Sequence, residues 1–116
     1  MGPIQTPAPA IGTLTDRVQL QRKVTTGETE GGATIVFMTL ATAWARVRAI
    51  AGRPGQAADG RSVVASHAVV LRFRSDIGPG DRMIYRGRAL EVVGAEDPDG
   101  RRAWLSCTCT ETSIAG

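Results

Sequence analysis

Residue types that could support catalysis are few and scattered in this sequence. The single histidine, His67, stands next to Ser66, but the chain has no Gly-x-Ser-x-Gly turn that would expose a nucleophilic serine. Because a nucleophilic triad needs a positioned histidine base, this pair is interpreted as ordinary strand residues. The one lysine, Lys23, lies between Arg22 and Val24 and not in the Gly-Lys-Ser or Gly-Lys-Thr context of a phosphate-binding loop. The sequence therefore predicts no catalytic residue and favours a protein that is not an enzyme.

Metal and cofactor sites are equally poorly supported. Cys107 and Cys109 stand two residues apart in a strand-like stretch, so their side chains share one face and cannot easily bridge each other. With one histidine in the chain, a four-ligand zinc site lacks donors, and we expect both thiols to be free and buried. The acidic group of Glu96, Asp97 and Asp99 lacks the later bidentate glutamate of a calcium loop, and a proline and a glycine within it favour a turn. No metal and no cofactor is predicted.

Arginine dominates the charge of the chain. Of the 14 basic residues only Lys23 is a lysine, and the net charge at pH 7 is +3. This mild excess permits contact with nucleic acid without requiring it. Codon bias of a GC-rich genome explains the arginines; the alternative is that their guanidinium groups bind carboxylates or phosphates. No apolar run approaches the roughly 20 residues needed to cross a bilayer.

The elements that would position these residues are strands, because apolar and polar residues alternate through much of the chain. A length of 116 residues allows one domain. Alternation or β-rich composition predicts strands over 17–23, 35–40, 42–50, 67–74, 83–85, 89–93 and 102–110. Turn sequences at 78–81, 86–88 and 97–100 separate the later strands. The predicted fold class is all-β: a small single-domain β-barrel of about six strands.

Four segments surround or interrupt this predicted barrel, which spans residues 14–111. Residues 1–13 contain three prolines and no periodicity, which predicts an extended N-terminal arm that reaches a neighbour. Residues 112–116 form a short C-terminal tail. The Gly-rich stretch 25–34 predicts a loop or the turn of a long hairpin. The stretch 51–66 is too long and too rich in glycine for a tight turn, so it predicts a long mobile loop.

Five motifs occur in the order and at the spacing of a known family. Residues 14–22 (LTDRVQLQR) are similar to an opening strand of the form Leu-x-x-Arg-Val-x-Leu-Gln-Arg. The others are a Trp-Ala-x-Val strand within 42–47 (TAWARV), VLRFR at 70–74, DRMIYRGR at 81–88 and LSCTCTE at 105–111. Together they resemble the phage head-to-tail joining proteins, also called head closure or stopper proteins of long-tailed phages. The chain departs from that family in its Pro-rich arm and at 52–65, where relatives often have a longer, more polar loop.

The resemblance implies a structural protein of the virion, without catalysis or cofactor. Such subunits are β-barrels that assemble as a ring, here expected to hold six or twelve copies, at the head-tail connector. The implied neighbours are the portal and adaptor ring above and the tail terminator or tail tube protein below. The ring would close the head around packaged double-stranded DNA and would assemble in the host cytoplasm.

Two sets of residues are candidate contacts within such a ring. Arg53 and Arg61, in the predicted long loop, are candidates to face the DNA channel, where arginines contact phosphates without reading sequence. Trp44, Arg46 and Arg48 alternate along a predicted strand and are candidates for a subunit boundary. Two alternatives stay open: an adaptor or tail-terminator ring of the same particle, and a non-specific nucleic-acid-binding β-barrel.

Overall fold

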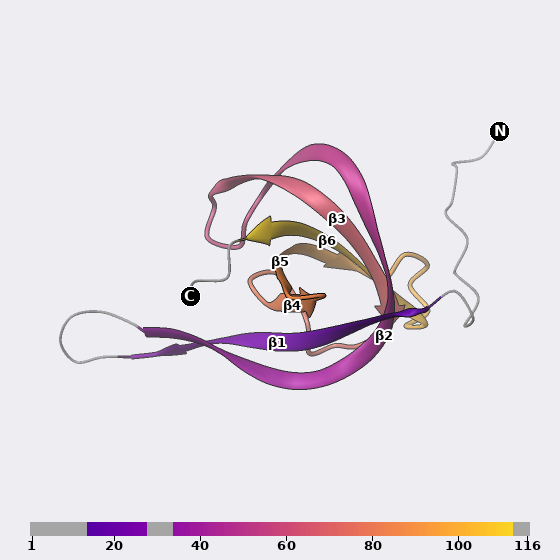
Figure 1. The fold of residues 1–116 in the computed structure, drawn as a ribbon, viewed down its shortest axis with the longest axis horizontal. Coiled ribbons are helices and arrows are strands. Elements are labelled where there is room, and N and C mark those ends of the chain that lie inside the picture. The colour runs from indigo at the N-terminus through magenta and orange to yellow at the C-terminus, as the bar shows by residue number, and fades with distance from the viewer. Residues whose placement is uncertain (1–13, 28–33, 113–116) are drawn as a thin grey trace.

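The computed structural model describes residues 14–27 and 34–112. Its strands are β1 (Asp16–Thr26), β2 (Thr34–Gln56), β3 (Ser62–Arg72), β4 (Arg82–Tyr85), β5 (Arg88–Glu96) and β6 (Trp104–Thr112). Every neighbouring pair is antiparallel, and the sheet closes into a barrel in the order β1-β2-β3-β6-β5-β4 (Figure 1). In this part of the chain no helix is long and apolar enough to span a membrane. The predicted all-β fold is confirmed.

The limits of the barrel lie close to those predicted. β1 begins at Asp16 and β6 ends at Thr112, against a predicted barrel of 14–111. The predicted arm (1–13) and residues 113–116 of the predicted tail lie outside the described residues, as does the 28–33 part of the predicted Gly-rich loop.

The core fills the inside of the barrel. Its largest fully buried side chains are Leu20, Leu71, Met83, Leu90, Val18, Val69, Val92, Cys107 and Cys109. The predicted inward position of the two cysteines is confirmed. Thr110 directly follows the buried Cys109 on β6 and is nevertheless only 8% exposed. Its hydroxyl donates to the Val64 carbonyl oxygen at 2.8 Å, and that hydrogen bond makes the burial of a polar side chain tolerable.

The predicted long mobile loop at 51–66 is wrong. β2 instead runs for 23 residues, so that only 57–61 connects it to β3. Glycine and proline favour loops in general, but here the β2–β3 register shifts between Ala49 and Arg53, as at a β-bulge. The ladder then resumes and includes Pro54. Bulges are a usual way for strands to accommodate such residues.

Part of β1 and β2 projects beyond the barrel as a two-stranded ribbon (Figure 1, left). β4 pairs with β1 only at 19–21, and the pairing of β3 with β2 begins at Ala45. Residues 22–26 and 34–38 therefore pair only with each other, and we call them the ribbon. The ribbon carries three of the exposed large apolar side chains: Ile35, Val36 and Met38. An isolated two-stranded ribbon is marginally stable in water, so contact with a partner would support it.

The predicted turns 86–88 and 97–100 are observed where the sequence places them. Arg86 and Gly87 join β4 to β5 with φ values of 50° and 78°, the left-handed region in which glycine is favoured. The turn at 97–100 is closed by a hydrogen bond from the Gly100 amide to the Asp97 carbonyl oxygen at 3.3 Å. These short connections keep the ends of the barrel compact, apart from the ribbon.

Candidate functional site

Arginine and tryptophan alternate in a row across the outer face of the barrel. Arg17 on β1 pairs in register with Trp44 on β2, and its guanidinium carbon lies 4.9 Å from the centroid of the indole. Arg72 on β3 pairs with Trp104 on β6 in the same way, at 5.7 Å. Because Trp44 and Arg72 border the same groove, the four side chains form one continuous set, here called the Arg–Trp row.

Strand alternation directs the Arg–Trp row outward. Each member stands next to a residue buried in the barrel: Val18, Ala45, Leu71 or Leu105. Since successive side chains leave a strand on opposite faces, burying those residues exposes the row. Trp44 remains 54% exposed although a guanidinium covers part of it. Exposed tryptophan beside an oriented arginine is the composition typical of the centre of a protein–protein contact.

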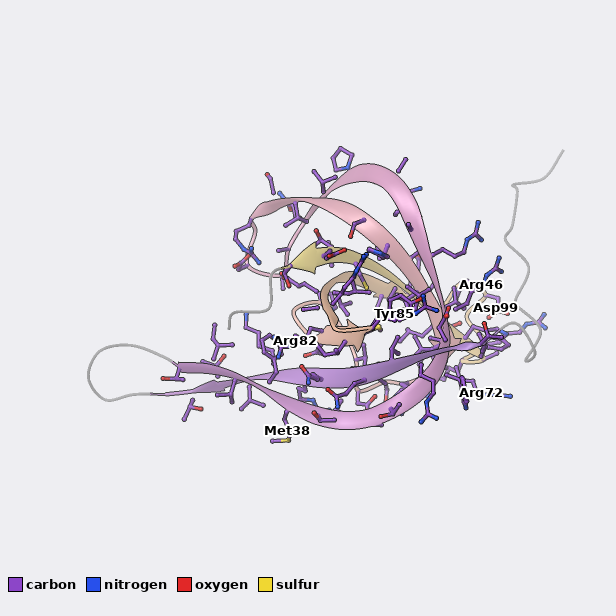
Figure 2. The ribbon with its side chains drawn as sticks, viewed as in Figure 1. Met38, Arg46, Arg72, Arg82, Tyr85 and Asp99 are labelled. Carbon is purple, nitrogen blue, oxygen red and sulfur yellow. The ribbon has the colours of Figure 1, made fainter. Side chains whose placement is uncertain are left out.

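The predicted subunit-boundary residues lie on this face. Trp44, Arg46 and Arg48 occupy alternate positions of β2 and so share its outer side, with Trp44 and Arg48 exposed and Arg46 half-buried. Figure 2 shows Arg46 and Arg72 at the same end of the barrel. The structure thus brings all three predicted residues to one surface, beside the Arg–Trp row.

Sequence analysis missed the other members of that row. Arg17, Arg72 and Trp104 each fall in a predicted strand, and alternation alone predicts that they face outward. Their proximity, however, depends on β3 lying next to β6, which are separated in the chain by two other strands. The sequence could show that these three side chains point outward. It could not show which strands are neighbours, and so could not show that the side chains lie together.

A groove of about 720 Å³ opens beside Trp44 at this end of the barrel. Leu14 and Phe73 add apolar surface to its wall. Arg74 also borders it, but donates two hydrogen bonds of 2.9 Å to the carboxylate of Asp76. These bonds raise the pKa of Arg74 and lower the pKa of Asp76. Arg74 is therefore paired, while the other guanidinium on the groove, that of Arg72, lies over the Trp104 indole at an exposed position beside the apolar wall.

The predicted DNA-channel residues, Arg53 and Arg61, lie near the C-terminal end of β2 and in the connection that follows it. Arg53 is exposed on β2 opposite Ala65. Arg61 stands in the short connection, where its Nε lies 2.8 Å from Asp59 and its Nη2 lies 3.1 Å from Glu91. Hydrogen bonds to these two carboxylates raise the pKa of Arg61. No ion pair to Arg53 is present within residues 14–27 and 34–112, so no neighbouring carboxylate offsets its charge there.

Every aromatic ring of the chain lies close to an arginine. The sequence has two tryptophans, two phenylalanines and one tyrosine, and the tryptophans are both in the Arg–Trp row. The remaining pairs are Arg82–Phe37 at 3.9 Å, Arg86–Tyr85 at 5.2 Å and Arg102–Phe73 at 5.8 Å. Proteins that bind single-stranded nucleic acid stack bases on aromatic faces. One face of each ring is already occupied here, which weakens the nucleic-acid-binding alternative.

The residues that could do covalent chemistry form no assembled site. Ser66 Oγ lies 2.8 Å from His67 Nδ1 and also accepts a hydrogen bond from the Glu111 amide at 2.8 Å. His67 is buried, so its imidazole is shielded from a substrate, while Ser66 is half-buried. Burial raises the pKa of Cys107 to about 12 and raises the pKa of Cys109 as well, so both free thiols stay protonated at neutral pH. The described part of the chain holds no cluster of metal-ligating side chains.

The comparison with protein families decides what kind of barrel this is. The family model for the phage head completion protein matches residues 9–112, which is nearly the whole chain. This chain belongs to the phage head completion protein family. Membership confirms the resemblance found in the sequence and gives the chain a structural role in the head-tail connector of a phage-type virion.

Solved structures share the fold of this head completion protein. The solution structure of protein SF1141 from Shigella flexneri 2a is 25% identical, with a TM-score of 0.66 and coverage of 90% of this chain and 98% of that one. A chain from the virion of a native gene transfer agent particle is 20% identical, with a TM-score of 0.62 and coverage of 85% and 94%. No curated protein sequence matches the chain.

Proposed function

We propose that this head completion protein forms a homo-oligomeric ring beneath the portal and adaptor, closes the DNA-filled head and docks the tail. The observation that carries the ring is the exposure of Trp44, which is 54% accessible in the centre of the Arg–Trp row. A large aromatic group gains most when a second protein removes it from water. Trp44, Arg46 and Arg48 are therefore proposed as residues of the subunit boundary.

The shape of the subunit supports contacts between unlike surfaces. The ribbon projects from one part of the barrel with exposed Ile35, Val36 and Met38, while the groove and the Arg–Trp row lie elsewhere on it. A ring is built from heterologous contacts, in which one patch of each copy meets a different patch of the next. A protein of this size also buries little core of its own, so association adds stability that the monomer lacks.

Packaged DNA is the proposed content of the ring. Arg53 is the stronger of the two candidate phosphate contacts, because Arg61 is already paired with two carboxylates. We expect Arg53→Ala to reduce DNA retention in filled heads and Arg61→Ala to reduce it less. If the double variant retains DNA like the unmodified particle, the channel assignment is wrong.

The ring is tested by measuring the mass of the purified protein across concentration by light scattering, alone, with the portal, and with the portal–adaptor complex. We expect a ring either alone or upon addition of the portal–adaptor complex. Recruitment by the portal without its adaptor would assign the chain to the adaptor position instead. A chain that stays monomeric with both, yet is retained by DNA, would favour the nucleic-acid-binding barrel. Assembly is expected in the host cytoplasm, and the final location is the virion.

A further inference from the structure

We propose that the groove beside Trp44 binds the N-terminal segment, residues 1–13, of a neighbouring copy. The inference rests on the ring proposed above, because the neighbour must stand beside the groove. Each subunit would then hold the next one through a strap of its own chain, in addition to the contact between barrel faces.

The chemistry of the segment fits the groove. Residues 1–13 contain no charged side chain and three prolines, at positions 3, 7 and 9. Proline-rich segments adopt the polyproline helix and dock in grooves lined by aromatic side chains, with little loss of chain entropy. Trp44 and Phe73 supply such a lining. Arg74 is paired with Asp76, and Arg72 lies over an indole at an exposed position, so an uncharged occupant has no ion pair of the groove to break.

The length of the segment fits a neighbour. The two shorter dimensions of the subunit are 28 and 26 Å, so copies standing side by side place equivalent grooves about that far apart. A polyproline helix rises about 3.1 Å per residue, so in that conformation Pro9 would lie roughly 16 Å and Pro3 roughly 34 Å from Leu14. The spacing of the copies falls between those two values, within the proline-rich part of the segment.

The position of Leu14 lets the segment reach the neighbouring copy. Leu14 is 8% exposed and already lines the groove of its own subunit. Because Leu14 forms part of the wall of its own groove, the 13 residues before it begin at that groove, and their extended length is sufficient to reach the groove of the next copy.

Disulfide cross-linking between two single-cysteine variants tests the proposal on the full chain. Thr6→Cys lies about 25 Å from Leu14 along a polyproline helix, and Thr42→Cys stands in the groove on an exposed position. The two variants are mixed under the conditions in which the ring forms and are then oxidised. Val64→Cys, which replaces a 62% exposed residue at the far end of β3, takes the place of Thr42→Cys in the control mixture. The native thiols are buried and protonated, so they do not compete.

The expected result is a covalent dimer of Thr6→Cys with Thr42→Cys, at least about tenfold more abundant than with Val64→Cys, because docking raises the effective concentration to the millimolar range. A ring that forms normally with no excess of this dimer would overturn the strap and leave the ring standing. A Thr6→Cys/Thr42→Cys double variant that cross-links only within one chain would also overturn it. If neither the ring nor the covalent dimer formed, both the proposed ring and the proposed strap would be wrong.

Discussion

Truncation of Trp44 should lower the association constant of the subunits strongly while leaving the barrel folded. Trp44 stands between Arg17 and Arg72 in the Arg–Trp row and is 54% exposed in the isolated subunit. In a ring that buries this face, Trp44→Ala removes the apolar area that association would otherwise take from water. We therefore expect a variant that folds but assembles only at higher concentration.

The magnitude follows from the exposed area. A tryptophan side chain presents on the order of 250 Å², so the 54% that remains accessible amounts to ~135 Å². At ~25 cal/mol per Å² this surface is worth roughly 3 kcal/mol for each subunit contact, or about a hundredfold in association constant. This free energy applies when the neighbouring subunit covers the exposed part of the Trp44 indole completely.

Light scattering or sedimentation across concentration measures this shift directly. The comparison variant is Tyr85→Ala, which also removes an aromatic ring that lies beside an arginine but stands on β4, outside the Arg–Trp row; its hydroxyl donates to Asp16 Oδ1 at 3.4 Å. The control variant should assemble at the concentration of the unmodified protein, and thermal unfolding of both variants shows whether each is folded. Trp44→Ala assembling at the unmodified concentration would refute the reasoning.

Three further predictions concern the fold itself. Met83→Ala, at a core position with 0% exposure, should lower the free energy of unfolding by about 2–5 kcal/mol in urea titrations. The Asp76 carboxyl has its pKa lowered from 3.8 by hydrogen bonds from Arg74. Its stabilising contribution is therefore present above that value and is lost as pH falls through the lower folded pKa, so Asp76→Asn should flatten the acid limb of a melting-temperature profile. In Gly52→Ala the added carbon would stand 2.8 Å from Val64 Cγ1, a destabilising clash that Val64→Ala should relieve in a double-mutant cycle.

Each of these predictions has a contrary outcome. An unchanged urea midpoint for Met83→Ala would contradict the closed core. An Asp76→Asn chain with the same acid sensitivity as the unmodified protein would show that the Arg74 pair contributes nothing to it. Additive losses in the Gly52 and Val64 cycle would show that the two side chains do not meet.

The barrel itself could be predicted because its strands carry a period of two. Ala45 is fully buried between the outward Trp44 and Arg46, and that alternation predicts the strand over 42–50. The same logic placed Cys107 and Cys109 inside. Period, turn chemistry and length are local properties, so one sequence is enough to show them.

The candidate site was only half predictable, because it depends on contacts between distant segments. Trp44 could be placed on an outer face, but its pairing with Arg17 and its closeness to Arg72 follow from register and strand order. The glycines after Ala49 indicated a loop, since nothing in the local sequence reveals that Val64 and its neighbours would pair with them across a bulge. The pairing of Arg61 with Glu91 on β5 was hidden for the same reason, whereas Asp59 is a local partner two residues before it.

The continuity of β2 means that three surfaces of the subunit share one length of backbone. Its 23 residues would measure about 75 Å if straight, which exceeds the 56 Å long axis, so the strand must curve around the barrel as Figure 1 shows. The ribbon, Trp44 and Arg53 follow one another along it without an intervening loop. Tension applied at the ribbon would therefore pass along a hydrogen-bonded strand toward the arginine proposed to touch DNA. The β2–β3 ladder is interrupted once on that path, at the register shift between Ala49 and Arg53.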